Sequence, residues 1–309
     1  MIRVARAVLA GSVVTSLLAA AAPAPAVPSQ PVQFAKVDGA TLGFRTAGSG
    51  PGKALLLISG SSNTMAEWDP RLLDELATSR RVIVFDNRGA GTSTGDVSRL
   101  TIAQMARDTA QLIDQVGGGP LDVLGWSMGG YIAQELAIRF PGRVHRLVLA
   151  STDCGGPSTI GPTPAALKIL IDPNATTKQR MSILFPKNRM GAAAAWQASV
   201  GEAFAANGYQ PANSFAVTAK TAQAQARAAG PLWLGPGMGT CSRLGRIKAP
   251  TLVSGGVRDI VVPIVNRKAL TAGIAGAQGR VYPDAGHAFL FQPGLRFGAE
   301  VTSFLAEPT

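Results

Sequence analysis

The sequence predicts an α/β protein built on an open, mostly parallel sheet with helices packed against it. Short runs of Val, Ile and Leu bounded by turn residues are typical of parallel strands buried on both faces; they cover 54–59, 81–86, 121–125, 146–151, 251–255 and 280–282. Helical periods alternate with these runs, at 68–78, 102–116, 128–139, 263–272 and 295–305. The 309 residues are 46% hydrophobic and 15% charged, enough to bury a full core. Strands alternating with helices predict right-handed crossovers in one sheet.

The N-terminus has the layout of a secretory signal. Arg3 and Arg6 precede an apolar run over 7–22, and small residues follow at 23–26. The apolar run is shorter than the ~20 residues that span a bilayer, which argues against an uncleaved anchor. We therefore expect residues 1–26 to be a cleaved signal peptide and the mature chain to be secreted or associated with the cell envelope.

Two further features complete the organisation of the chain. Alternating runs at 32–37 and 41–46, split by Asp38-Gly39, predict a β-hairpin before the parallel strands. Residues 155–240 show no strand pattern but several weak helical ones, at 164–171, 177–185, 192–206 and 215–229. A stretch this long between two core strands is more typical of a helical cap than of a loop. We expect a core of 27–154 and 241–309, with a cap of 155–240 inserted after the strand at 146–151, which follows the helix at 128–139.

Cys154 and Cys241 stand at the two edges of this cap. In an exported chain they can form a disulfide that closes the base of the cap. Two buried free thiols are the alternative, and both stay open here because sequence does not give the distance between them.

The chain is basic, with a formal net charge of +11. Such a surface attracts anionic polymers. No basic cluster with interleaved aromatic residues and no helix-turn-helix pattern is present, so we expect no nucleic-acid partner. The charge suits electrostatic association with an anionic cell envelope.

The candidate nucleophile is Ser127 in Gly125-Trp126-Ser127-Met128-Gly129. A buried strand pattern comes directly before this serine and a helix pattern directly after it, as a nucleophile elbow requires. A second G-x-S-x-G match centres on Ser93, but it lies in a segment rich in Gly, Thr, Ser and Asp with no helix after it. Position therefore favours Ser127.

A serine needs a base to remove its proton, and the chain has two histidines. His287 follows the last strand and so lies on the same rim of the sheet as Ser127. His145 lies in a helix-to-strand connection at the opposite rim, where we expect a surface residue. The sequence therefore favours His287 as the base.

The carboxylate that orients the base has several candidates near strand ends: Asp86, Asp122, Asp153, Asp259 and Asp284. Asp259 follows a core strand on the correct rim and gives the chain order Ser, Asp, His. Asp153 follows the strand after the nucleophile and remains the alternative.

An oxyanion hole needs two backbone N–H donors. The first donor is expected to be the backbone N–H of Met128, the residue after the nucleophile. The second is expected at Ser61 in the loop 59–63, which could otherwise be an ordinary polar turn.

These motifs together resemble the α/β-hydrolase superfamily, from about Val32 to the C-terminus. The matching stretches, in order, are Leu55–Gly60, Asp86–Ser93, Gly125–Gly130, Gly256–Asp259 and Asp284–His287. The resemblance is to capped serine esterases, enol-lactonases and cofactor-free haloperoxidase-like perhydrolases. In that family the second stretch is a structural loop, which removes Ser93 as a candidate. The chain departs from the family at Ser59-Gly60, where His-Gly is usual.

The expected function is that of a secreted serine hydrolase acting on a small-molecule acyl substrate, with no cofactor and no metal. An acyl-enzyme formed on Ser127 would be hydrolysed by water. Pocket residues are expected among Ser62, Trp68, Trp126, Trp196, Trp233 and Met238. The alternatives are a proline iminopeptidase-like aminopeptidase, a perhydrolase, and a noncatalytic binding protein on the same scaffold.

Overall fold

The computed structural model describes residues 30–117, 119–172, 174–206 and 217–308. The signal peptide expected at 1–26 lies outside these ranges. None of the helices in this part of the chain has both the length and the apolar composition needed to cross a bilayer.

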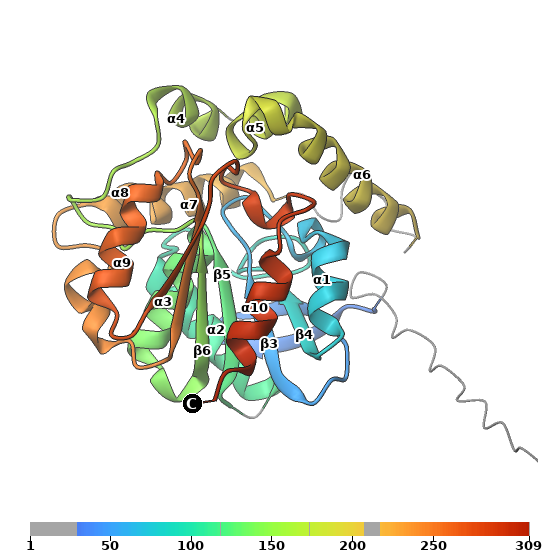
Figure 1. Cartoon of the computed structure of the whole chain (residues 1–309). Coiled ribbons are helices and arrows are strands. Elements are labelled where there is room, and N and C mark those ends of the chain that lie inside the picture. Colours follow the sequence, from blue (N-terminus) through green and yellow to red (C-terminus); the bar gives the residue numbers. More distant parts are fainter. Residues whose placement is uncertain (1–29, 118, 173, 207–216, 309) are drawn as a thin grey trace, which may run out of the picture.

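The core is one sheet of eight strands in the order β1-β2-β4-β3-β5-β6-β7-β8 (Figure 1). The strands are β1 Gln33–Val37, β2 Ala40–Ala47, β3 Gly52–Ile58, β4 Arg80–Phe85, β5 Leu121–Trp126, β6 Val144–Ala150, β7 Thr251–Gly256 and β8 Gln278–Tyr282. The first two form the expected antiparallel hairpin, and β2 pairs antiparallel with β4. All remaining pairs are parallel. The prediction of a mostly parallel sheet is confirmed.

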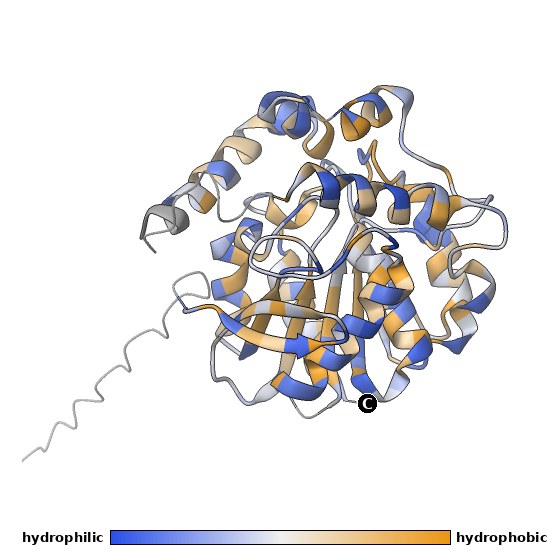
Figure 2. Cartoon of the chain, turned by 180° about the vertical axis from the view of Figure 1, so that it is seen from behind, coloured by the Kyte–Doolittle hydropathy of each residue, from blue (hydrophilic) through white to orange (hydrophobic). Residues whose placement is uncertain are grey.

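Helices cover both faces of this sheet. They are α1 Pro70–Ala77, α2 Ile102–Val116, α3 Met128–Arg139, α9 Arg267–Gly273 and α10 Phe297–Ala306. One core cluster joins α2, α3 and α9 to one face, and a second joins α1 and α10 to the other. Seen from behind, hydrophobic strands lie between helices that turn hydrophilic residues outward (Figure 2).

Element boundaries differ from the sequence prediction where a cap residue sets them. Asp69 accepts a hydrogen bond from the Arg71 amide and Pro70 follows it, so α1 begins at Pro70 and not at Trp68. A 3₁₀ turn, Ile264–Asn266, replaces the first turn expected of α9.

The middle segment forms the helices α4 Pro164–Ile171, α5 Thr177–Leu184, α6 Met190–Ala206, α7 Ala219–Ala229 and α8 Pro231–Leu234. Helices α4 to α6 arch over the top of the sheet in Figure 1. They contact loops that follow the carboxyl ends of strands: the Thr163 amide donates to Ile260 O (2.9 Å) and the Ala288 amide donates to Leu184 O (3.0 Å). At the base of the segment, Cys154 and Cys241 form a disulfide.

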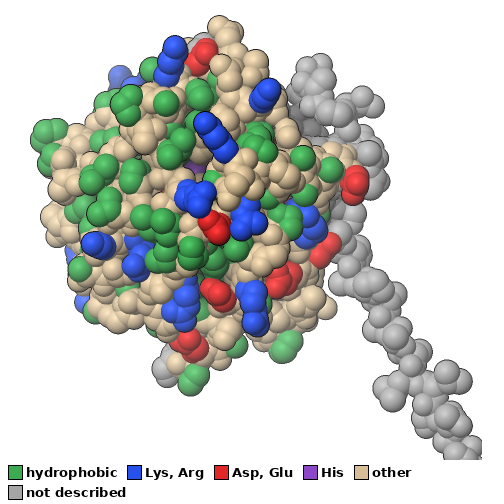
Figure 3. Space-filling view, turned by 45° about the horizontal axis from the view of Figure 1, so that its top comes forward, with side chains coloured by type: hydrophobic (Ala, Val, Ile, Leu, Met, Phe, Trp, Pro, Cys, Tyr) green, Lys and Arg blue, Asp and Glu red, His purple; other side chains and the backbone are tan. Residues whose placement is uncertain are grey.

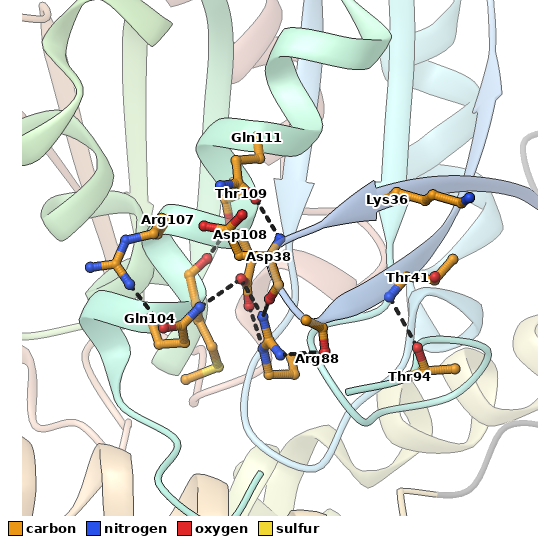
Figure 4. Close-up of polar contacts among 12 residues, drawn as sticks. Lys36, Asp38, Thr41, Arg88, Thr94, Gln104, Arg107, Asp108, Thr109 and Gln111 are labelled. Carbon is orange, nitrogen blue, oxygen red and sulfur yellow. Dashed lines mark hydrogen bonds and ion pairs between the residues drawn. The ribbon is translucent and has the colours of Figure 1, made fainter. Parts of the chain in front are cut away.

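The loop after β4 is fixed by Arg88. Its guanidinium donates to both carboxylate oxygens of Asp108 on α2 (2.8 and 2.7 Å) and to the carbonyl oxygen of Asp38 in the hairpin turn (2.6 Å; Figure 4). Ser93 in this loop is buried, donates to Asp86 O (2.7 Å) and accepts from the Gly43 amide (2.9 Å). Ser93 therefore has the structural place expected of it.

Candidate active site

Ser127 occupies a sharp turn between β5 and α3. Its backbone has φ 56° and ψ −122°, in a region that non-glycine residues rarely enter. The turn can close because its neighbours are glycines: a Cβ on Gly129 would collide with the carbonyl oxygen of Ile58, and one on Gly125 would collide with Gly129. The serine therefore lies at the N-terminus of α3, whose dipole favours negative charge.

His287 and Asp259 meet at the same rim of the sheet. Nδ1 of His287 lies 2.8 Å from Oδ2 of Asp259, and both side chains are buried. The other carboxylate oxygen accepts hydrogen bonds from the amides of Val261 (2.9 Å) and Val262 (2.8 Å). The carboxylate is thus held by the backbone and can fix the imidazole with Nε2 facing away from it.

Trp126 ties this pair to the serine turn. Its indole N–H donates to the carbonyl oxygen of His287 (3.0 Å), and its ring centroid lies 5.6 Å from that of the imidazole. Among the described residues no hydrogen bond joins the Ser127 hydroxyl to the His287 ring, a contact that often tightens only when substrate binds. Trp126 is thus the chain neighbour of Ser127 and contacts His287, which in turn contacts Asp259.

Asp153, the alternative carboxylate, is engaged elsewhere. It accepts hydrogen bonds from the Tyr131 hydroxyl (2.8 Å), the Trp233 indole (3.0 Å) and the Gly155 amide (2.8 Å). Burial raises the pKa of this carboxyl group, and these three donors oppose the rise. Asp259, not Asp153, contacts the His287 ring.

His145 lies at the rim of the sheet opposite Ser127, as expected, and its side chain is partly exposed there, but it also has a buried partner. Its Nδ1 lies 2.7 Å from Oδ1 of Asp122, and its side chain is only 24% exposed. Asp122 also pairs with Arg80 (2.9 Å). These groups meet because all three lie at or near the amino ends of their parallel strands, at the edge of the sheet opposite Ser127; β5 and β6 are neighbours, and Arg80 on β4 reaches Asp122 across β3. The chain therefore has two His–Asp pairs, of which one lies near the serine turn.

The loop 59–63 packs against the serine turn. A Cβ on Gly60 would lie 3.3 Å from Cβ of Ser127. The Ser59 hydroxyl accepts a hydrogen bond from the Trp68 indole (2.9 Å), and Ser62 has φ 59°. The loop thus brings the backbone of Ser61 to the neighbourhood of Met128, the first residue of α3.

Gln225 and Glu67 also contact this part of the chain, and neither was predicted from the sequence. The Ser62 amide donates to Oε1 of Gln225 on α7 (2.7 Å). The Thr64 amide donates to Oε2 of Glu67 (2.7 Å), in a capping box that the T-x-x-E spacing of Thr64 and Glu67 could have revealed. Burial raises the pKa of the Glu67 carboxyl to about 7, against the opposing effect of the Thr64 hydrogen bond.

All four tryptophans are buried, and each indole N–H donates to the protein itself. The acceptors are Ser59 Oγ for Trp68, His287 O for Trp126, Glu67 O for Trp196 and Asp153 Oδ1 for Trp233. The indoles thus connect parts of the site and of the cap. Their expected contact with substrate, like that of the exposed Ser62 and Met238, stays a prediction.

Comparisons with known proteins show the family of this chain. A family model described as alpha/beta hydrolase fold matches residues 53–293. A 2-hydroxy-6-oxononadienedioate/2-hydroxy-6-oxononatrienedioate hydrolase from Klebsiella pneumoniae is 30% identical over 287 residues, which cover 89% of this chain and 95% of that protein. A 2-hydroxymuconate semialdehyde hydrolase from Pseudomonas sp. strain CF600 is 32% identical over 279 residues, covering 84% and 89%. Among solved structures, an alpha/beta hydrolase fold protein from Chitinophaga pinensis has a TM-score of 0.80 at 22% identity, covering 92% of this chain and 100% of that one.

Proposed function

Because this chain belongs to the α/β-hydrolase family, we propose that it is a serine hydrolase that cleaves a carboxylic ester, lactone or thioester. Ser127, His287 and Asp259 would carry the reaction. The strongest support is the buried His287–Asp259 pair. The indole of Trp126 donates a hydrogen bond to the His287 carbonyl, and Trp126 directly precedes Ser127, whose backbone geometry is strained.

The reaction would run in two halves. His287 Nε2 takes the proton of the Ser127 hydroxyl as Oγ attacks the acyl carbonyl, and the N–H groups of Ser61 and Met128 stabilise the oxyanion. The imidazolium then protonates the leaving alkoxide or thiolate as the bond to the acyl carbon breaks. Water, deprotonated by His287, releases the acid and restores Ser127. Asp259 keeps the proton on Nδ1 and stabilises the imidazolium.

A noncatalytic binding protein on the same scaffold is less well supported. Backbone strain of the kind at Ser127 costs about 1–3 kcal/mol and persists where it serves a function. A binding protein would gain nothing from a strained serine beside a buried His–Asp pair. The geometry therefore favours catalysis.

The test is hydrolysis of short p-nitrophenyl esters by the mature chain and by Ser127→Ala. Ser93→Ala is the matched control, because Ser93 is the serine of the other G-x-S-x-G match. We expect loss of turnover and of covalent labelling by a fluorophosphonate in the first variant only. Equal turnover by wild type and Ser127→Ala would sink the assignment. Lactones, aminoacyl amides and a peroxide acceptor run in parallel would separate the esterase from the aminopeptidase and perhydrolase alternatives.

Export and envelope association form a second part of the proposal. They are supported by the signal-like N-terminus, by the net charge of +9 that remains once Arg3 and Arg6 leave with the signal (27 basic against 18 acidic residues), and by aliphatic side chains exposed around α4: Ile160, Leu167, Leu170 and Ile171. Figure 3 shows a face on which hydrophobic side chains gather among Lys and Arg. Cosedimentation with vesicles that contain phosphatidylglycerol, but not with neutral vesicles, would support the association, and mass spectrometry of exported protein would locate the cleavage site.

A further inference from the structure

The loop after β3 differs from the usual family pattern at its first residue, Ser59. The Ser59 hydroxyl accepts a hydrogen bond from the indole N–H of Trp68 (2.9 Å). The loop nevertheless holds Ser62 in the left-handed region, at φ 59°, which is unfavourable for a residue other than glycine. Such a conformation persists only where surrounding contacts enforce it, and the Ser62 amide is held from outside the loop.

The group that holds it is Gln225, from helix α7 of the cap. Oε1 of Gln225 accepts the hydrogen bond of the Ser62 amide at 2.7 Å, across 163 residues of sequence. A backbone amide can only donate, so this contact fixes which way the carboxamide faces. The Gln225 side chain is fully buried, and its Nε2 has no partner among the described residues.

Helix α7 is held against the core by hydrogen bonds. The Thr221 hydroxyl donates to Gly89 O (2.9 Å), and Arg227 donates to Ser98 O (2.8 Å). Gly89 follows Arg88, whose guanidinium joins the hairpin to α2 (Figure 4). Gln225 therefore belongs to a helix that is hydrogen-bonded to the core of the molecule.

We infer that Gln225 is a positioning residue for the oxyanion hole. By holding the Ser62 amide it sets the conformation of the loop and the direction of the preceding N–H, that of Ser61. This inference rests on the proposed function, and it makes a cap helix part of transition-state stabilisation. An oxyanion donor acts mainly on charge that develops in the transition state, so a displaced loop lowers kcat and leaves KM nearly unchanged.

Three variants test this role. Gln225→Leu removes the acceptor, Gln225→Glu keeps an acceptor oxygen, and Gln223→Leu alters an exposed residue two positions away on the same helix. With p-nitrophenyl acetate we expect Gln225→Leu to lower kcat about tenfold or more with KM changed less than about twofold. We expect Gln225→Glu to recover most of kcat and Gln223→Leu to match wild type.

Amide hydrogen exchange at Ser62, followed by NMR without substrate, reads the same contact independently of turnover. Protection should fall about tenfold in Gln225→Leu and persist in Gln225→Glu, as expected for loss of one hydrogen bond. If the wild type hydrolyses no ester but the Ser62 amide loses protection from exchange in Gln225→Leu, the hydrogen bond is confirmed and the proposed function is refuted. If the wild type is active, unchanged kcat in the folded Gln225→Leu protein overturns the inference, even where its Tm is lower.

Discussion

The indole N–H of Trp126 donates to the carbonyl oxygen of His287 at 3.0 Å, so the residue before the proposed nucleophile holds the main chain of the proposed base. Trp126→Phe keeps an aromatic ring but deletes this bond. We expect kcat to fall about tenfold with little change in KM, because small misplacements of catalytic groups are costly. Steady-state kinetics beside a melting curve measures this. An unchanged kcat would show that the bond does not position His287.

The two His–Asp pairs should behave differently. His287→Ala should lower kcat by about 10³-fold or more, because it removes the general base. His145→Ala should leave kcat within about twofold and lower Tm, since the buried Asp122 loses one of its hydrogen-bond partners and keeps its ion pair with Arg80. Comparable losses of kcat in both variants would contradict the separation of the two pairs.

The same contrast applies to the two carboxylates. Asp259→Asn should lower kcat about 10⁴-fold by favouring the wrong imidazole tautomer. Asp153→Asn should lower kcat by less than about tenfold and mainly reduce Tm, because Tyr131 and Trp233 donate to different carboxyl oxygens and one of these becomes an amide NH2 group. A larger loss of kcat in Asp153→Asn than in Asp259→Asn would assign the catalytic role to Asp153.

Glu67 makes stability depend on pH. Its carboxyl pKa is raised from 4.5 to about 7 by burial, so the folded state binds the proton more tightly than the unfolded state does. This contribution is fully present below pH 4.5 and is lost as pH rises to about 7. Glu67→Gln cannot titrate and still accepts from Thr64, so its Tm should fall less across this window. Calorimetry at several pH values measures the difference, with the exposed Glu202→Gln as control; parallel curves for Glu67→Gln and wild type would refute it.

Removing the disulfide should loosen the base of the cap. Cys154 and Cys241 are 87 residues apart, and in the chain-entropy model a loop of that length is worth about 4.6 kcal/mol. Replacing both by Ser should lower the free energy of unfolding by up to about this amount, measured by urea denaturation. An unchanged midpoint and slope would show that the bond adds no stability.

The fold was largely predictable because parallel strands buried on both faces leave a compositional trace. The run 121–125 became β5 Leu121–Trp126, and the helix predicted at 128–139 is α3. The contact between His287 and Asp259 followed from the same reasoning, since residues after the ends of parallel strands gather at one rim; their catalytic role stays a prediction. The disulfide pairing could not be decided in advance because it depends on a distance.

What the sequence could not indicate are contacts that depend on distant packing. Gln225 lies in an Ala-rich helix where a glutamine is an ordinary helix former, and its partner Ser62 is 163 residues away. His145 likewise finds Asp122 only because β5 and β6 are neighbours in the sheet. No local pattern marks either contact.

The four buried indoles give the protein an internal optical signal. Trp196 and Trp233 belong to the cap and donate to Glu67 and Asp153, while Trp68 and Trp126 lie in the core beside the serine turn. A movement that parted the cap from the sheet would expose cap indoles to water and shift the fluorescence emission to longer wavelengths. Opening of the site would therefore be visible in solution without an added dye, at a stage when the circular dichroism of the sheet is still unchanged.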